Sequence, residues 1–299
     1  MCLDRTCYFC CTSGSLLGLD ATALGNNQTM TVHETSDTRR LLEDDEVPPV
    51  LEENAGSRSP FFFTCDHYGR LIPRALGDLG VHAGEHERHI ARDIGIAEVA
   101  TWLAKEMDVH LIAQRYSRLV IDCNRPFDSP GSIPLISEAT EILGNGGLNH
   151  EQVTARRQAV FAPYHARIAQ ALDQRKAQGL PTILVSLHSF TPVYAGIARP
   201  WHIGTLYHRD DRLPHLLRDR LRHEGDLVVG DNEPYAVSDA TDYTIPVHGE
   251  QRGLMHTGIE IRQDLIDDQS GQHQWAERLA RVLREIEETL HARKLMPAE

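Results

Sequence analysis

The sequence has little that would indicate a membrane or extracellular protein. It contains no run of about 18 uninterrupted apolar residues that could cross a bilayer. Only two of its six cysteines, Cys65 and Cys123, lie beyond residue 11. This argues against a domain that is stabilised by disulfides and fits a reducing cytoplasm. Basic residues number 30 against 43 acidic ones, and the net charge of −13 argues against a broad surface for nucleic acid or anionic membranes. We therefore expect a cytoplasmic protein that acts on a small molecule, in an oligomeric state that the sequence does not define.

The first part of the chain lacks the hydrophobic periodicity of packed elements. We expect residues 1–29 to be an extension or a mis-set start, with a weak signal peptide as the alternative. Cys7 and Cys10 have the spacing of a metal knuckle, but no second pair follows at a suitable distance. Residues 30–59 are rich in Asp, Glu, Ser and Pro, which predicts a mobile acidic lead-in. The folded domain is expected over residues 60–299.

Beyond that point, apolar runs alternate with long helical patterns. Helices are predicted over residues 87–107, 151–177, 213–222 and 272–294, and strands over residues 61–65, 109–113, 119–123, 182–187, 203–207, 226–229 and 257–261. Strands that alternate with helices of ten or more residues indicate an α/β fold. We expect a single domain with a mixed, mainly parallel sheet that is covered by helices on both faces.

Polar residues follow several of the apolar runs directly. They are Asp66-His67, Asn124-Arg125 and His188. In open α/β sheets, ligands bind outside the carboxyl ends of the strands, so these residues are candidates for a site. Glu260 differs because it lies inside the apolar run at residues 258–261, and a carboxylate in a buried strand must be paired, hydrogen-bonded or functional.

The two histidines fit a catalytic zinc, which takes three ligands from His, Asp or Glu and keeps one open position. Either His67 or His188 alone would more often be a satisfied histidine at a strand end. A His-x-x-Glu ligand pair is absent, because position 70 is Arg70. The best carboxylate is Asp93, predicted early in a helix, where its alternative role is to stabilise the helix start. His89, one helical turn before it, could orient that carboxylate or bind the metal itself.

Arginines form a second candidate group, because their planar fork binds a carboxylate or polarises a carbonyl. Arg125 follows Asn124, while Arg118 is seven residues upstream and would face the other side of a regular strand. It therefore needs a bend or a loop position to join the site. The alternatives are ion pairs, of Arg118 with Asp122 and of Arg125 with Asp128.

Residues 230–253 have no clear periodicity and are long enough for a loop that covers the substrate. Tyr235 in this segment could donate to the substrate, and an irregular surface loop is the alternative. His165 and His256 are candidates for packed or orienting histidines.

Several segments together resemble the N-formylglutamate amidohydrolase family, a branch of the zinc carboxypeptidase-like and aspartoacylase-like hydrolases. The resemblance runs from about Phe62 to the C-terminal helix and rests on residues 65–70, 89–95, 117–126, 187–189, 230–235 and 260–265. It implies one zinc ion on His67, Asp93 and His188, with Glu260 as the general base. The wider group has Glu three residues after the first His, which this chain lacks.

The chemistry of the remaining residues agrees with that resemblance. Arg118 could stabilise the oxyanion, while Asn124 and Arg125 would hold the substrate's carboxylate. We expect hydrolysis of an N-formyl or N-acyl amino acid such as N-formylglutamate, which gives formate and the free amino acid. The alternatives are a carboxypeptidase-like or deacylase activity on another small N-acyl substrate, and a non-catalytic module that binds a carboxylate.

Overall fold

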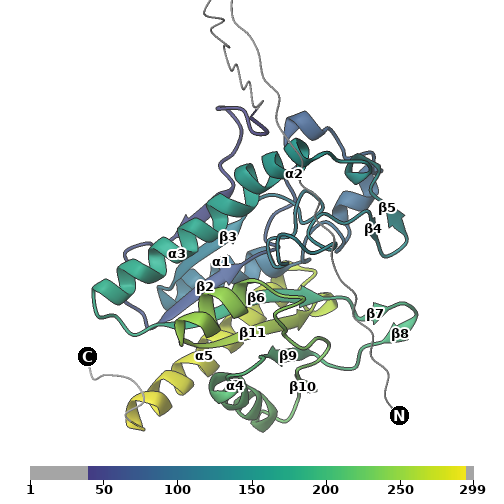
Figure 1. The fold of residues 1–299 in the computed structure, drawn as a ribbon. Coiled ribbons are helices and arrows are strands. Elements are labelled where there is room, and N and C mark those ends of the chain that lie inside the picture. Colours follow the sequence, from purple (N-terminus) through teal and green to yellow (C-terminus); the bar gives the residue numbers. More distant parts are fainter. Residues whose placement is uncertain (1–39, 294–299) are drawn as a thin grey trace, which may run out of the picture. The chain divides into compact units, whose positions relative to one another are not determined.

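Seven strands form one mixed sheet in the order β1-β3-β2-β6-β11-β9-β10 (Figure 1). The computed structural model describes residues 40–293. The strands are β1 (Val50–Glu53), β2 (Phe61–Cys65), β3 (His110–Gln114), β6 (Ile183–Phe190), β9 (Ile203–Leu206), β10 (Val229–Asp231) and β11 (Met255–Arg262). Only β1 with β3 and β11 with β9 pair antiparallel, while the other neighbours are parallel. The prediction of a mixed, mainly parallel sheet is confirmed.

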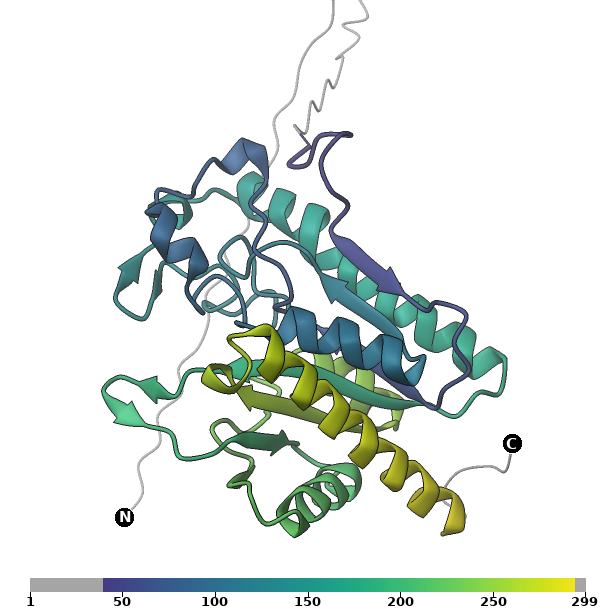
Figure 2. The ribbon, with the colours of Figure 1, turned by 180° about the vertical axis from the view of Figure 1, so that it is seen from behind.

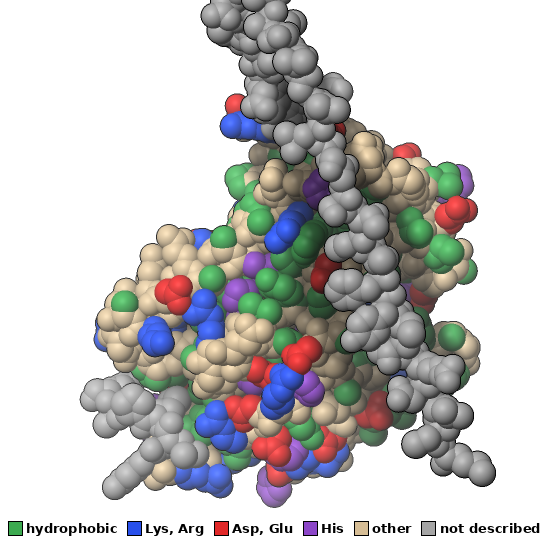
Figure 3. Space-filling view, viewed as in Figure 1, with side chains coloured by type: hydrophobic (Ala, Val, Ile, Leu, Met, Phe, Trp, Pro, Cys, Tyr) green, Lys and Arg blue, Asp and Glu red, His purple; other side chains and the backbone are tan. Residues whose placement is uncertain are grey.

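Helices cover both faces of this sheet. They are α1 (Ile96–Met107), α2 (His150–Arg156), a π-helical turn (Arg157–Phe161), α3 (Ala162–Ala177), α4 (Arg212–His223) and α5 (Gln269–Ala292). Figure 1 shows α3 in front of the sheet, and Figure 2 shows α1 and α5 on the opposite face. Charged side chains of both signs gather on the lower part of the face in Figure 3, where α4 lies with its leucines turned inward.

Short elements extend from the main layers. Two hairpins are β4 (Ile136–Ser137) with β5 (Thr140–Glu141) and β7 (Val193–Tyr194) with β8 (Ile197–Ala198). A second π-helical turn is Ile245–Gly249, and 3-10 turns are Arg74–Leu76, Ala83–Glu87, Leu143–Asn145, Glu250–Arg252 and Gln263–Leu265. Figure 1 shows both hairpins on the same side of the molecule, beyond the ends of the central strands. No helix among residues 40–293 combines the length and apolar character of a bilayer span.

The apolar run of β2 explains why both faces are covered. Phe61 and Phe63 pack into the core shared with α1 and α5, whereas Phe62 packs into the core shared with α3. Successive side chains of a strand point to opposite faces, so three consecutive phenylalanines require apolar partners on both sides. Cys65 and Cys123 are also buried, as free thiols.

The sheet begins earlier than the sequence predicts. β1 lies ahead of residue 60, within the segment expected to be a mobile lead-in, and pairs Val50 with Gln114 at the edge of the sheet. The strand is short and its second half is acidic, so it shows no clear period. Glu52 instead contacts His110 and Arg167. The expectations for residues 1–29, Cys7-x-x-Cys10 included, lie outside the described residues.

Two predicted elements near the site are wrong. The helix expected from residue 87 begins only at Ile96, because the chain turns at Gly95 with a positive φ of 76°. The run 119–123 is a buried loop and not a strand. Its carbonyls have side-chain partners instead of a β ladder: the guanidinium of Arg156 donates to Val120 O at 3.0 Å, and Asn145 donates to Leu119 O at 2.9 Å. These bonds satisfy backbone groups that would otherwise be buried without a partner.

Candidate functional site

A pocket of ≈ 680 Å³ lies at the carboxyl ends of the central parallel strands. Residues of β6 and β11 line it, together with the segments that follow β2 and β3. All eight residues singled out in the sequence line this pocket: His67, Asp93, Arg118, Asn124, Arg125, His188, Tyr235 and Glu260. The structure therefore brings the predicted residues together, and their roles stay predictions.

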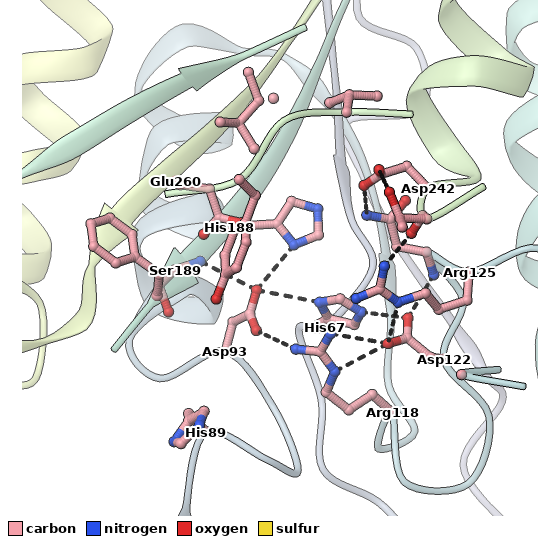
Figure 4. A pocket seen from close by; sticks show the side chains of 18 of the residues that line it. His67, His89, Asp93, Arg118, Asp122, Arg125, His188, Ser189, Asp242 and Glu260 are labelled. Carbon is pink, nitrogen blue, oxygen red and sulfur yellow. Dashed lines mark hydrogen bonds and ion pairs between the residues drawn. The ribbon is translucent and has the colours of Figure 1, made fainter. Parts of the chain in front are cut away.

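Two histidines converge on one carboxylate oxygen (Figure 4). Nδ1 of His188 lies 3.0 Å from Oδ2 of Asp93, and Nδ1 of His67 lies 3.4 Å from the same oxygen. All three residues are buried, and their potential ligand atoms lie within 4.8 Å of one another. Two imidazole nitrogens and one carboxylate oxygen are a ligand set that suits a catalytic zinc ion.

The two histidines are positioned by strands of the sheet, whereas Asp93 is positioned by a loop. His67 is the second residue after β2, and His188 lies inside β6, which runs three residues further than predicted, to Phe190. Asp93 is not in a helix as predicted, but in the loop that leads into α1. The positive φ of Gly95 turns the chain there, so the carboxylate reaches the sheet instead of the helix dipole.

The remaining ring nitrogen of each histidine faces a buried carboxylate. Nε2 of His67 lies 2.8 Å from Oδ1 of Asp122, and Nε2 of His188 lies 3.2 Å from Oδ2 of Asp66. Such partners fix the orientation and tautomer of a metal-binding imidazole. The geometry thus leaves both Nδ1 atoms to bind a cation.

The electrostatics of the cluster favour positive charge at its centre. Burial opposes charge on every member. The hydrogen bonds that the His188 imidazole donates to the Asp66 and Asp93 carboxylates outweigh burial and raise the pKa of His188 well above its usual range. Burial likewise raises the pKa of Asp93, and the charge of His67 reverses this and leaves that pKa far below its usual range. A divalent cation would replace the two protons that this environment otherwise holds on the imidazoles.

Glu260 lies beside this cluster on β11. It is opposite His188 in the strand register, it is 7% exposed, and its Oε2 atom has no hydrogen-bond partner. Burial raises the pKa of Glu260 to about 7, the Asp93 carboxylate adds to the effect, and His188 opposes it. A carboxylate with a pKa near neutrality can both accept and return a proton at physiological pH.

Arg118 links the acidic groups of the cluster. Its Nη1 donates to Oδ1 of Asp93 at 3.1 Å, and its Nη2 donates to Oδ2 of Asp122 at 3.0 Å. The ion pair with Asp122 is the alternative that the sequence left open, and it coexists with a place in the pocket because residues 117–123 form a loop. A guanidinium has five N–H groups, so donors remain for a ligand.

Asn124 and Arg125 are held by the loop that follows β10. Oδ1 of Asn124 accepts from Thr244 N at 3.1 Å, and Nδ2 donates to Asp242 Oδ1 at 3.3 Å. Arg125 donates to the carbonyl of Thr241, and its ion pair is with Asp122 at 3.9 Å instead of Asp128. Asn124 therefore holds the loop in place, and the exposed guanidinium of Arg125 faces the pocket.

Comparison with known proteins decides the family. The sequence profile of the N-formylglutamate amidohydrolase family matches residues 59–267. The chain belongs to this family. A solved gene product of Agrobacterium tumefaciens is 36% identical with a TM-score of 0.79, over 83% of this chain and all of that one.

An N-formylglutamate amidohydrolase from Ralstonia eutropha shares the fold, with a TM-score of 0.59 at 17% identity, over 82% of this chain and 99% of that one. A comparison with curated proteins found no match. Family membership supports hydrolysis of an amide as the reaction.

Three further histidines that the sequence singled out, His89, His165 and His256, contact groups other than His67, Asp93 and His188. His89 lines the pocket, but its Nε2 lies 3.1 Å from Glu138, away from His67 and His188 (Figure 4). His165 bonds the carbonyl of Cys123, and His256 bonds the carbonyl of Leu254. None of the three therefore belongs to the group of His67, Asp93 and His188.

Sequence reasoning did not assign the contacts that two carboxylates make with the histidines of this amidohydrolase. Asp66 was a candidate beside His67 but was given no role, and its side chain faces His188 on β6. Asp122 was considered only as an ion-pair partner of Arg118. Their complete burial with charge is a structural signal that no sequence pattern carries.

Proposed function

We propose that the protein is a zinc-dependent hydrolase of N-formyl or other N-acyl amino acids that keep a free carboxylate. The observation that supports it best is the convergence of two imidazole Nδ1 atoms on one oxygen of Asp93, next to the unpaired carboxylate of Glu260. The name of the family points to N-formylglutamate, which we take as one member of this substrate class. The products would be the free acid, formate in the simplest case, and the amino acid.

The metal would sit between His67, Asp93 and His188. When bound, a zinc ion supplies a Lewis acid and lowers the pKa of water to about 7, which an unactivated amide requires for attack at neutral pH. The three protein groups leave one side open towards the pocket that they line. Asp66 and Asp122 keep the two imidazoles in the orientation that this binding needs.

Glu260 would be the general base. Its unpaired Oε2 accepts a proton from the attacking water, and the same carboxyl group then donates that proton to the leaving amine. The pKa near 7 suits both steps, since neither protonation state is strongly disfavoured at neutral pH. The apolar surroundings of the strand raise that pKa by keeping bulk water away from the carboxylate.

The arginines would hold the substrate. Arg118 is 24% exposed and fixed by two carboxylates, so its free N–H groups can stabilise the negative charge that develops on the carbonyl oxygen. Arg125 would bind the α-carboxylate, and Tyr235 at the pocket rim would donate a further hydrogen bond. Together these contacts align the amide with Glu260.

The experiment that tests the proposal combines metal analysis with turnover. The purified protein should contain about one divalent metal ion per chain and should release free amine from N-formyl or N-acetyl amino acids. The Glu260→Gln variant should keep the metal and lose turnover. A wild-type protein without stoichiometric metal, or a variant with unchanged turnover, would show that this mechanism is wrong. The cytoplasmic location expected from the sparse cysteines stays a prediction.

A further inference from the structure

One wall of the pocket is apolar and carries no charge. A separate hydrophobic cluster consists of Leu206 at the end of β9, Val237 in the loop after β10 and Ile245 at the start of the second π-helical turn. Each of these side chains is 6% exposed or less. All three also line the pocket. The small residues Ala236 and Ala240 line it beside them. A ligand in the pocket would therefore contact this wall, although its side chains have little contact with water.

Gly258 joins this wall to the catalytic strand. It lies two residues before Glu260 on β11, so both residues are on the same face of the strand. A Cβ atom at position 258 would lie 3.1 Å from the Leu206 Cβ and 3.2 Å from the Ile245 Cδ1, so the absence of a side chain allows the wall to approach the strand closely. The apolar wall thus directly adjoins the general base that we propose.

The other end of the wall adjoins the group that would bind the carboxylate. The segment from Val237 to Ile245 donates its Thr244 N–H to Asn124 and accepts a hydrogen bond from Arg125 at Thr241 O. Because the segment adjoins Arg125 at one end and the Glu260 strand at the other, an amino acid with its carboxylate at Arg125 and its amide nitrogen near Glu260 would have this segment beside its side chain.

Among the described residues, the arginines at or beside the pocket already have partners. Arg199 does not line the pocket; it lies over the Tyr235 ring, 4.9 Å from the centroid, and donates to Thr191. The arginines that line the pocket are Arg118 and Arg125, within the part of the chain that the structure describes. Arg118 is held by Asp93 and Asp122 and its remaining N–H groups are needed for the carbonyl oxygen, while Arg125 is needed for the α-carboxylate. A second carboxylate would lose its water against Leu206, Val237 and Ile245 without gaining a partner, which is unfavourable.

We infer that the protein prefers substrates with an apolar side chain, of the size of methionine or leucine, over glutamate. The inference rests on the proposed function, because it takes the orientation of the substrate from the roles of Arg125 and Glu260. It adds that the wall of Leu206, Val237, Ile245 and Gly258 determines specificity. The family name would then not describe the preferred substrate of this chain.

The decisive comparison uses three unbranched side chains of similar length. The zinc-loaded protein is assayed with the N-formyl derivatives of methionine, glutamine and glutamate, and kcat/KM is measured from the release of free amine. We expect methionine to exceed glutamine by about tenfold and glutamate by more, since polar groups lose their hydration against an apolar wall. A kcat/KM for glutamate equal to or above that for methionine would overturn the inference.

A pair of matched variants tests the wall itself. Val237→Ala should lower kcat/KM for N-formylmethionine about tenfold and leave that for N-formylglycine, which has no side chain, almost unchanged. Val228→Ala makes the same change at a valine that is 47% exposed and lies outside the pocket, and should affect neither substrate. If Val237→Ala affects both substrates equally although its melting temperature and circular dichroism are unchanged, Val237 does not determine specificity.

Binding separates this inference from the proposed function. Isothermal titration of the zinc-loaded Glu260→Gln variant measures the affinity for N-formylmethionine and N-formylglutamate without turnover. Tighter binding of the methionine derivative supports the apolar site even if the wild-type protein hydrolyses neither compound, a result that would refute only the proposed function. Equal binding, tighter binding of the glutamate derivative, or no binding of either would refute the inference.

Discussion

Glu260 stands directly opposite His188 in the register between β11 and β6. Residues in register on neighbouring parallel strands point to the same face of a sheet, so the base that we propose and one ligand are held by backbone hydrogen bonds and not by a loop. Their separation is therefore set by the spacing of two strands, about 4.8 Å, and a mutation of either side chain should leave the other in place.

Glu260→Gln should therefore separate chemistry from metal binding. The amide is nearly isosteric but cannot accept the proton of the attacking water, so kcat should fall by roughly 10²–10⁴-fold. Zinc content should stay at one per chain, because Glu260 is not in the ligand set. Glu98→Gln changes an exposed glutamate on α1 and should retain full activity. Loss of zinc together with activity would contradict this division of roles.

Removal of the metal should destabilise the fold. A ligand that binds only the folded state at 100 times its Kd adds about 2.7 kcal/mol of stability. Zinc should therefore raise the melting temperature of protein treated with a chelator, as measured by calorimetry. His188→Ala removes one of the three ligands and should abolish most of the zinc-dependent rise, whereas the exposed His223→Ala should not. An unchanged melting temperature in the wild-type protein would argue against a bound metal.

Asp66 should act through His188. Its carboxylate faces Nε2 of that imidazole and accepts hydrogen bonds from the hydroxyls of Tyr164 at 2.9 Å and Thr244 at 2.6 Å. Asp66→Asn keeps the shape but removes the charge, and we expect zinc affinity to fall about 10–100-fold in a chelator competition assay. Asp267→Asn, at an exposed carboxylate, is the control. Unchanged zinc affinity would mean that Asp66 only fills a polar cavity.

Arg125→Lys should mainly affect substrate binding. Lysine keeps the charge but loses the planar fork that binds a carboxylate through two N–H groups. We expect KM to rise about 10–100-fold with a smaller change in kcat, in steady-state assays. Arg58→Lys, at an exposed position away from the pocket, should change neither constant. A variant that lowers kcat while KM stays constant would place Arg125 in the chemical step instead.

Stability should fall in mild acid because of two buried histidines. Burial lowers the pKa of His165 to about 4, although Asp66 and the hydrogen bond to the Cys123 carbonyl oppose it. Burial also lowers the pKa of His248 to about 3, His165 and Arg252 lower it further, and Asp66 and Asp173 oppose them. The unfolded chain binds these protons from about pH 6.5 downward. Their contribution to stability is therefore complete above that pH and is lost as the pH falls towards 4 and 3.

For His165 alone, this loss amounts to about 2 kcal/mol between pH 7.5 and pH 5. Urea denaturation across this range should show a weaker pH dependence in His165→Gln than in the wild-type protein. The glutamine amide can still donate to the carbonyl of Cys123, which the histidine reaches at 2.8 Å. Equal slopes for both proteins would show that His165 does not control acid stability.

Much of the fold and the candidate site could be predicted from sequence. The apolar run at Phe61–Cys65 is a strand as predicted, and the polar residues that follow the runs do meet in one pocket. The rule that ligands bind at the carboxyl ends of parallel strands was sufficient to find His67 and His188, and the burial of a carboxylate within an apolar strand was sufficient to find Glu260. These residues could be found because the sheet places them.

The features that could not be predicted depend on hydrogen bonds between residues that are distant in sequence. Residues 119–123 have the apolar pattern of a strand, but their carbonyls are bonded by Asn145 and Arg156, 26 and 36 residues further along the chain. Likewise, Asp66 contacts a histidine on another strand, more than 100 residues away. A local pattern cannot show which distant side chain forms a hydrogen bond, so the loop and the histidine partners of Asp66 and Asp122 were not predicted.

The division of the ligand set between the sheet and a loop has a mechanical consequence. Asp93 is 26 residues from His67 and 95 from His188 along the chain, so an ion shared by all three closes two long rings of backbone. Both cysteines in the described residues are free thiols, and no disulfide closes such a ring there. The ion would thus crosslink the folded state alone, and it would fasten the loop before α1 to the strands in a protein that has no disulfide in this region.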